Sequence, residues 1–389
     1  MQLSPGTTVC VACEAVIRTD EKALIVGGGL AGSMVALELA RGGRPSVLLE
    51  RSSRPRNIVC GEFLSSETIH YLARHRVDLA ELGAVPIAKV RVALPRHILQ
   101  EDLPFPAYSL TRFRLDEELL RRAAMAGVDV QRDCHVNELE EHSGMWHVSA
   151  RDGRTFRSAD VFLATGKHDL RGWPRPAGTQ RGLVAFKMYF TLTAQQHTAL
   201  GNAVELILFR GGYAGLQPVE GGRVNLCLLV TARRLQQAGS TWAGLLPDLL
   251  RESSHLADRL HGAVPLLDAP LAASHIPYGH MQAESPGGLW RVGDQAAVIP
   301  SFCGDGMAIA LHSGALAARH YLLRDRSVVY QGQLRRHLGH RLAFATRLSQ
   351  CLVAFPAAGH IARLVPGLLS RIACMTRISD SVLLRDGQH

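Results

Sequence analysis

The distribution of hydrophobic residues near the start of the chain predicts a strand, a helix and a second strand. Ala23–Val26 is apolar at every position, and a second, largely apolar run follows at Ser46–Leu49. Between them, apolar residues from 33 to 41 are spaced as in a largely buried helix. Strands without polar alternation are typical of parallel sheets that are covered on both faces. We therefore expect this segment to begin an α/β domain.

Predicted strands and helices continue to alternate to about residue 166, and longer strands follow. Predicted strands span 85–95, 128–131, 137–139, 146–150, 160–166, 183–192, 204–210, 223–230, 275–279 and 289–294. Predicted helices span about 66–82, 115–127 and 245–260, and another ends near 323. Pro104 and Pro106 predict a break in the chain, and residues 334–377 predict helices broken at Pro356 and Pro366.

These elements predict a Rossmann-type α/β domain with a parallel sheet, an inserted antiparallel-sheet domain and a C-terminal helical segment. Residues 1–21 show no clear period and are expected to form an extension. The nucleotide-binding domain is expected at 22–170, with a strand of the second domain near 85–104, and again at 275–330. The inserted sheet, a natural platform for a substrate, is expected at 171–274. Residues 331–389 are expected to form a helical cover.

The turn after the first strand carries the strongest motif in the chain. Gly27, Gly29 and Gly32 occupy the three glycine positions of GxGxxG. The first allows the tight turn, the second lets a pyrophosphate approach the backbone, and the third lets the helix pack on the strand. Glu50 ends the second strand, eighteen residues after Gly32, where its carboxylate can accept from both ribose hydroxyls. Together these features predict a dinucleotide site.

A second glycine-rich junction follows the last predicted strand. Asp294 stands at the strand end, where it can accept from a hydroxyl of a cofactor, and Gly304 and Gly306 precede a helix. Glycines there allow the helix N–H groups to face a pyrophosphate or a flavin oxygen. Gly166, after another predicted strand, is expected at the same edge of the sheet.

Two further segments are candidates for the same pocket. Cys60, Gly61 and Glu62 follow the second strand, and we expect them either to line a reaction pocket or to serve as a buried thiol and a helix cap. Arg112 is expected either to bind cofactor phosphates or to pair with Asp116.

Composition limits the remaining possibilities. The chain has 389 residues, is 47% hydrophobic and carries a net charge of +9, and residues 331–389 hold eight arginines and two aspartates. This excess could steer an anionic cofactor or touch an anionic membrane surface through the C-terminal helices. The chain shows no pattern of a nucleic-acid-binding module, no apolar run long enough to span a membrane, and no secretory signal, so we expect a cytoplasmic protein.

The cysteines do not suggest a metal site. Eight are present without regular spacing and are expected to be reduced. Cys10 and Cys13 form one CxxC pair, but a zinc site needs two more ligands at comparable spacing, so we expect no metal.

With these residues placed, the chain resembles the flavoprotein superfamily that joins the aromatic-ring monooxygenases, of the para-hydroxybenzoate hydroxylase-like fold, to the geranylgeranyl reductases. The resemblance covers about residues 22–325. It rests on the glycine turn, on RFRLD around Arg112, and on GDQAAVIPSFCGDGMAIALHSGALAA from Gly293. Cys60–Gly61 is similar to the cysteine–glycine pair of the reductase branch, whereas the WxWxIP segment of related halogenases is absent.

This resemblance implies an FAD-binding domain and a set of site residues. The implied cofactor residues are Gly27, Gly29, Leu30, Ala31, Gly32, Glu50, Arg51, Cys60, Gly61, Arg112, Gly166, Gly293, Asp294, Gly304, Gly306 and Met307. Tyr213, Cys60 and Phe63 are expected to face a hydrophobic substrate. Glu62 and His275 are the candidate catalytic residues, and a surface or core role is the alternative for His275.

The resemblance also implies a redox reaction in which the flavin does the chemistry and NAD(P)H is the reductant. Our first expectation is a monooxygenase that uses O₂ to hydroxylate an aromatic or polyketide-like molecule. Two alternatives remain open within the same superfamily. They are a geranylgeranyl-reductase-like enzyme that saturates isoprenoid double bonds, and a flavin dehydrogenase that passes electrons to a quinone. A nucleotide-binding regulator is the non-catalytic alternative.

Overall fold

The computed structural model describes residues 16–18, 22–94, 97–357, 359, 365, 367–379 and 382–383, and it is built on three sheets. The first is a five-stranded parallel sheet in the order β18-β11-β2-β3-β7. Its strands are β2 (Ala23–Val26), β3 (Ser46–Leu49), β7 (Asp129–Gln131), β11 (Val161–Leu163) and β18 (Leu289–Arg291). The predicted α/β fold class is confirmed.

Each face of the parallel sheet packs against a different layer. Side chains such as Ile25 and Leu48 pack against the helices α1 (Leu30–Arg41), α3 (Arg112–Met125) and α8 (Gly306–Leu322). Leu24 and Val47 face the opposite way, toward the second sheet. That sheet has the order β1-β10-β9-β8, with β1 (Val16–Arg18), β8 (Val136–His142), β9 (Met145–Ala150) and β10 (Thr155–Ser158). Burial on both faces explains why these strands are apolar throughout.

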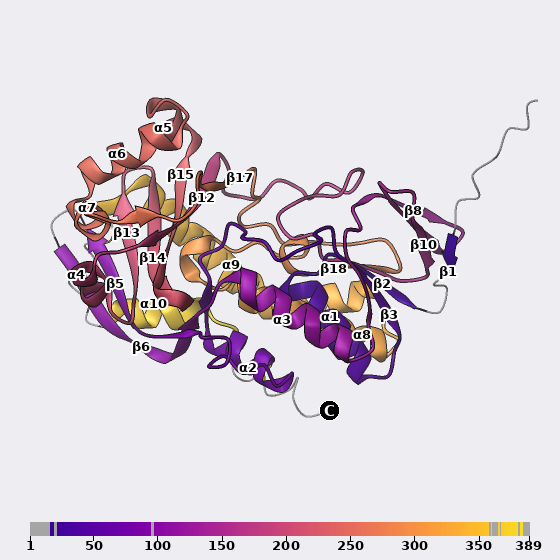
Figure 1. Cartoon of the computed structure of the whole chain (residues 1–389). Helices are drawn as coiled ribbons and strands as arrows, with labels where there is room; N and C mark the ends of the chain where they lie inside the picture. Colours follow the sequence, from indigo (N-terminus) through magenta and orange to yellow (C-terminus); the bar gives the residue numbers. More distant parts are fainter. Residues whose placement is uncertain are drawn as a thin grey trace, which may run out of the picture.

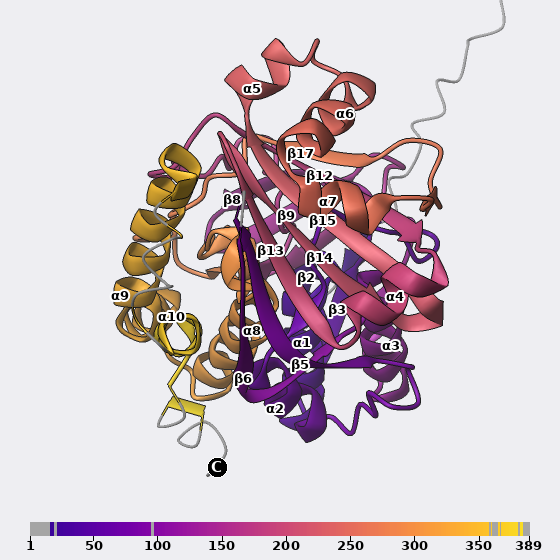
Figure 2. The same ribbon diagram turned by 90° about the vertical axis from the view of Figure 1, so that its left-hand side faces the viewer.

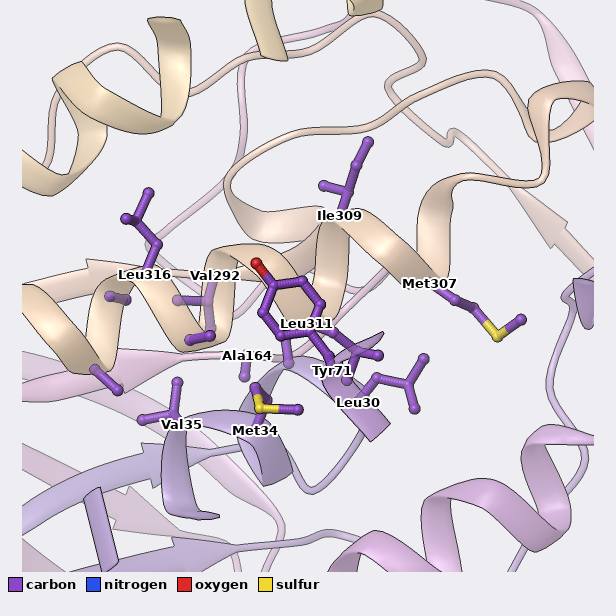
Figure 3. Packing of buried hydrophobic residues seen from close by; sticks show 14 of the residues in the cluster. Leu30, Met34, Val35, Tyr71, Ala164, Val292, Met307, Ile309, Leu311 and Leu316 are labelled. Atoms are coloured by element: carbon purple, nitrogen blue, oxygen red, sulfur yellow. The ribbon is translucent and has the colours of Figure 1, made fainter. Parts of the chain in front are cut away.

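Helices α1 and α8 lie side by side over the parallel sheet (Figure 1). Figure 3 shows the apolar contacts between them, where Met34 and Leu311 pack beside Tyr71 of α2 (Ser66–Arg74). The approach is close because a Cβ at Gly314 would lie 2.6 Å from the carbonyl oxygen of Ala31. Both helices begin at the same edge of the sheet, so their N-termini are held near one another.

The third and largest sheet is mostly antiparallel and has the order β16-β12-β15-β14-β13-β5-β6-β4, with β17 beside β12. Its strands are β4 (Phe63–Leu64), β5 (Val85–Leu94), β6 (His97–Ser109), β12 (Leu183–Thr191), β13 (Ala203–Phe209), β14 (Gly212–Val219), β15 (Arg223–Thr231), β16 (Val264–Pro265) and β17 (Leu271–Ser274). One face packs against α6 (Trp242–Glu252) and α7 (Ser254–Leu260), near α4 (Ala194–Leu200) and α5 (Ala232–Gln237). The other face looks toward the parallel-sheet domain.

The C-terminal helices close one side of this arrangement. α9 (Ser327–Ala354) packs Tyr330 and Leu338 into the core around α8, and α10 (Leu368–Thr376) lies between α9 and β6 (Figure 2). Pro356 follows α9 as predicted, whereas Pro366, Cys10 and Cys13 lie outside the described residues. Among the described residues, no helix combines the length and the apolar character that crossing a bilayer requires.

Several local predictions were wrong for identifiable reasons. The prolines at 104 and 106 do not break the chain. They lie in a bulge of β6 between Asp102, which pairs with Lys89, and Ala107, which pairs with Ile87. Residues in such a bulge are not paired with the neighbouring strand, so proline is tolerated there. Gly212–Val219 forms strand β14 in the middle of the sheet, where no strand was predicted. Residues 275–279 form no strand beyond a single bridge at Tyr278.

Other element boundaries also differ from the sequence-based expectation. The helix predicted for 245–260 is two helices divided at Ser253, whose side chain caps the second one. The helix predicted to reach residue 82 ends at Arg74. Within the predicted N-terminal extension, Val16–Arg18 pairs in parallel with β10 and so belongs to the four-stranded sheet. This pairing depends on a partner strand far along the chain.

Candidate functional site

Three adjoining cavities run from the parallel sheet to the large antiparallel sheet within the described part of the chain. The first, of about 380 Å³, is lined by Gly27 to Gly29 and by the end of β3. The second, of about 140 Å³, shares Gly29, Arg112 and Asp294 with the first. The third, of about 340 Å³, shares Gly61, Phe63 and Gly304 with the second. We call them the nucleotide cavity, the central cavity and the apolar cavity.

The glycine turn is built as the motif predicts. Gly27 has φ +110°, and a Cβ there would lie 2.4 Å from the carbonyl oxygen of Ala164. A Cβ at Gly32 would lie 1.9 Å from the carbonyl oxygen of Gly27, so both positions exclude any larger residue. Gly29 has room beside it and lines both the nucleotide and the central cavity. The N-terminus of α1 therefore presents bare backbone to the site.

The acid at the end of β3 is fixed by backbone donors. Glu50 is buried, its Oε2 accepts from the Gly28 N–H at 2.7 Å and its Oε1 accepts from the Ser52 N–H at 2.9 Å. The carboxylate lines the nucleotide cavity together with Arg51. Each oxygen retains a lone pair, so the carboxylate can still accept from a ribose hydroxyl.

Arg112 forms the expected pair with Asp116 and also lines the site. Its Nε and Nη2 donate to Asp116 at 2.6 and 2.9 Å, a bidentate ion pair within α3. The same side chain lines both the nucleotide and the central cavity. Because the pair with Asp116 holds the guanidinium in place, its remaining N–H groups are oriented before any anion arrives.

The second glycine junction lies against the first. Gly293, Asp294, Gly304, Gly306 and Met307 all line the central cavity, beside Leu30 and Ala31 of α1. The Ser313 hydroxyl accepts from the Gly293 N–H at 2.8 Å, which ties the strand end to α8. Gly166, with φ +65°, lines the same cavity. Residues from both ends of the domain therefore surround one elongated space, with glycines where a ligand must approach the backbone.

Comparisons with known proteins agree with this geometry. Residues 20–161 match the protein family described as FAD binding domain. The menaquinone reductase of Mycolicibacterium smegmatis is 26% identical over 362 residues, which cover 86% of this chain and 85% of the relative. These matches support an FAD-dependent oxidoreductase.

Solved structures show the same fold at low sequence identity. A flavoprotein/dehydrogenase from Cytophaga hutchinsonii superposes on this flavoprotein with a TM-score of 0.74 at 15% identity, covering 93% of this chain and 92% of its own. The flavin-dependent brominase Bmp2 gives a TM-score of 0.76 at 15% identity, covering 92% and 93%. The nucleotide and central cavities fit FAD, because the glycine turn, Glu50 and the start of α8 supply contacts for its successive parts.

In the central cavity of this flavoprotein, the loop from Cys60 to Glu62 forms one wall. Side chains of the large sheet hold it from behind. Gln217 Nε2 donates to the Gly61 carbonyl at 2.9 Å, and Asn225 Nδ2 donates to the carbonyls of Gly61 and Cys60 at 2.9 and 3.1 Å. The structure thus supports the pocket-lining interpretation of this segment over a helix-cap role.

Glu62 is fully buried and heavily bonded. Its Oε1 lies 2.5 Å from Nζ of Lys187, and Tyr189 Oη donates to the two carboxylate oxygens at 2.8 and 2.9 Å. The Arg112 backbone N–H also donates to Oε1, at 2.8 Å. Burial raises the pKa of Glu62 above its ordinary value, although Lys187 and the hydrogen bonds act in the opposite direction.

The apolar cavity lies between the large sheet and the C-terminal helices. Phe63, Tyr213 and Phe302 line it near the central cavity, and Tyr213 Oη lies 3.0 Å from Ser301 Oγ. The rest of its wall is mainly aliphatic. The aliphatic residues are Val90, Val92, Leu103, Val204, Leu206, Leu208, Leu348, Leu352, Leu368, Leu369 and Ile372.

The candidate residues predicted from sequence do not all come together. His275 is exposed, its Nδ1 lies 2.9 Å from Ser274 Oγ, and it lines none of the three cavities, so we assign it no role in the reaction. Lys187 and Tyr189 were missed. A lone lysine in the apolar run LVAFKMYF was the available signal, because a charge in a buried strand needs a buried partner.

Proposed function

We propose that this flavoprotein catalyses the reduction of a carbon–carbon double bond in a hydrophobic, isoprenoid-type substrate. Bound FAD would supply the hydride, and NAD(P)H would be the source of the electrons. Sequence analysis alone favoured hydroxylation of an aromatic molecule, with this reduction as the alternative. The shape and chemistry of the apolar cavity favour the alternative.

The single observation that carries the proposal is the aliphatic lining of the apolar cavity. Side chains from β5, β13, α9 and α10 surround about 340 Å³ beside the central cavity. A site for a small aromatic ring usually includes polar groups that fix its orientation. Here valine, leucine and isoleucine predominate over the polar lining residues Glu205, Gln217, Ser301, Thr376 and Arg377, and aromatic rings lie only at the end near Gly304. Such a space suits a branched hydrocarbon chain with its double bond placed next to the flavin.

The relatives support the same choice. The similarity to a menaquinone reductase extends over most of both chains, and menaquinone is a ring that carries an isoprenoid chain. The sequence resemblance to the geranylgeranyl reductases, through Cys60 and Gly61, points to the same substrate class.

The protein's own residues would place the substrate and exclude water. Phe63 lies at the junction of the two cavities, where a Cβ at Gly304 would be 2.8 Å from its ring. Tyr213 and Phe302 stand edge to face at 6.0 Å between ring centroids and form the adjoining wall. Together they confine an alkene to a dry space at the edge of the central cavity.

The test is an anaerobic reaction with NAD(P)H and menaquinone that has an unsaturated side chain. We expect a product heavier by two hydrogens in the side chain, detected by mass spectrometry. An oxygenated product formed only in air would instead establish a monooxygenase. Reduction of the quinone ring with the side chain unchanged would establish an electron-transfer dehydrogenase.

Filling the apolar cavity should weaken substrate binding without disturbing the cofactor. Gly215 lines this cavity in β14, and a Cβ there would make only ordinary contact, 3.7 Å from the Cys227 carbonyl oxygen. We expect Gly215→Phe to raise KM about tenfold or more. The phenyl ring would occupy space that the substrate needs, and the apolar contacts that the substrate loses there are worth about 1.4 kcal/mol or more. Steady-state kinetics and the flavin absorbance measure the two effects.

Gly215→Ala is the matched control, because its methyl group fits the existing space. Unchanged KM in Gly215→Phe would place the substrate elsewhere.

A further inference from the structure

A group of polar side chains lies buried behind the central cavity, on the face of β12 that looks toward it. Ala185, Lys187 and Tyr189 alternate along this strand and therefore share one face, and Ala185 lines the central cavity. Lys187 has no exposed surface and Tyr189 is only 1% exposed. On the opposite face, Phe186 and Met188 pack into the core against α6 and α7. The polar residues thus face the cavity side only.

The group converges on the carboxylate of Glu62. Lys187 Nζ lies 2.5 Å from Oε1, and Tyr189 Oη reaches both oxygens. The ammonium group also lies 4.5 Å from the centre of the Tyr189 ring. Oε2 has only the Tyr189 hydroxyl as a hydrogen-bond partner in the described structure, so it retains a free lone pair. Glu62 itself lines the central cavity.

Fold stability does not account for this arrangement. Two fully desolvated charged groups regain in mutual attraction little more than they lose in hydration, and well-packed apolar residues would serve the fold as well. Glu62 also adopts φ +64°, a left-handed conformation that costs a residue other than glycine about 1 kcal/mol or more. Such costs, gathered on the wall of a reaction cavity, are typical of functional residues.

We propose that Glu62, Lys187 and Tyr189 form a proton store that supplies the proton required when a hydride is added to the substrate. This inference rests on the proposed reduction of a double bond. Glu62 is the catalytic residue, because it reaches the cavity. Lys187 and Tyr189 are positioning residues that act through it.

The balance of the step is simple. Hydride from the two-electron-reduced flavin forms a C–H bond at one alkene carbon, and the π electron pair moves to the other carbon. That carbon takes a proton from Glu62, which recovers one from Lys187 across the 2.5 Å contact. The substrate gains two hydrogens and the flavin returns to its oxidised form. After the product leaves, solvent in the central cavity would return a proton to Lys187 through Glu62, which lines that cavity.

Burial favours a protonated carboxyl at Glu62, whereas Lys187 and the hydrogen-bond donors around the carboxylate act against it. From its own loop Cys60 faces it, with Sγ accepting the Glu62 N–H at 3.4 Å, and α3 contributes the Arg112 N–H. From β15, the Arg223 guanidinium lies over the Tyr189 ring at 5.3 Å, and Cys227 pairs with Lys187 across the strands. Burial raises the pKa of the Cys227 thiol to about 12, so it adds no charge near neutral pH.

The first test measures stability rather than turnover. A carboxyl whose pKa is raised in the folded state keeps its proton at pH values at which the unfolded chain has lost it. The free energy of unfolding therefore falls as pH rises above the ordinary pKa of 4.5. We expect urea unfolding of the FAD-saturated full chain to show this loss, and Glu62→Gln to lack it. An ordinary ion pair would give the opposite sign, with stability lost as pH falls.

Glu38 is the matched control for the direction in which stability changes with pH. This buried carboxylate of α1 lies 3.0 Å from His75 Nε2 and 3.4 Å from Arg74 Nη2, and its pKa is lowered by these partners against the effect of burial. Its contribution to stability should be lost as pH falls, and Glu38→Gln should remove that loss. If Glu62→Gln behaves like Glu38→Gln, the proton store is wrong.

The second test follows product formation in a single turnover with pre-reduced enzyme. We expect Glu62→Gln to slow this step about 100-fold, the size of one acid catalyst, without changing FAD binding. Lys187→Met and Tyr189→Phe should slow it less and shift its pH profile. A solvent deuterium effect should be present in the wild type and lost in Glu62→Gln.

The two proposals can fail separately. If the product is oxygenated, the reduction is wrong whatever the stability curves show. If the double bond is saturated but the Glu62, Lys187 and Tyr189 variants keep the wild-type rate and pH profile, the reduction stands and the proton store is overturned.

Discussion

Gly29→Val is expected to yield a folded protein that no longer retains FAD. The position has room for a side chain in the folded state, since a Cβ there would meet nothing closer than Arg112 Nη2 at 3.4 Å. That room is the junction of the nucleotide and central cavities, where a pyrophosphate must touch the backbone. Two added methyl groups would hold it away from the N–H groups of α1. We expect a loss of about 100-fold in affinity, or ~3 kcal/mol.

The flavin absorbance of the purified protein and its titration with FAD measure this effect. Urea unfolding of the FAD-free forms checks that the fold is intact. Gly287→Val is the control, because Gly287 is exposed, has nothing within 4 Å of an added Cβ and lines none of the three cavities. Full FAD occupancy in Gly29→Val would contradict the assignment of both cavities to the cofactor.

Gly314→Val is expected to destabilise the whole FAD-binding domain. A Cβ at Gly314 would lie 2.6 Å from the Ala31 carbonyl oxygen and 3.1 Å from Met34 Cβ, so valine forces α1 and α8 apart. Overpacking against backbone atoms that cannot move away costs about 3 kcal/mol or more. Because these helices carry the two glycine junctions, FAD binding should weaken together with stability.

Thermal and urea unfolding measure the loss, and FAD titration shows its effect on the site. Gly332→Val is the matched control, since Gly332 is an exposed position of α9 with nothing within 4 Å of an added Cβ. Its stability should change by only about 0.5 kcal/mol, and in the stabilising direction, because valine has a higher helix propensity than glycine. Equal stability of the two variants would show that the α1–α8 contact does not depend on a small residue at 314.

The cofactor half of the site could be predicted from the sequence because its signals are local. Gly27 and Gly32 must be glycine for reasons contained in one turn, and Glu50 follows from the length of one strand–helix–strand unit. The strands of the parallel sheet are apolar throughout because helices cover one face and a second sheet covers the other. The period of the apolar residues and the spacing of the glycines predict these features without any knowledge of distant contacts.

The substrate half was decided only by the tertiary structure. Glu62 gains its buried partners from strand β12, more than a hundred residues later in the chain, and the apolar cavity exists because α9 and α10 close over the large sheet. His275 shared its residue type with many catalytic residues, yet its backbone leaves it exposed. The sequence alone determined the nucleotide-binding turn and the fold class, since these depend on short-range geometry. The proton-bearing cluster and the cavity depend on long-range contacts, which only folding brings together.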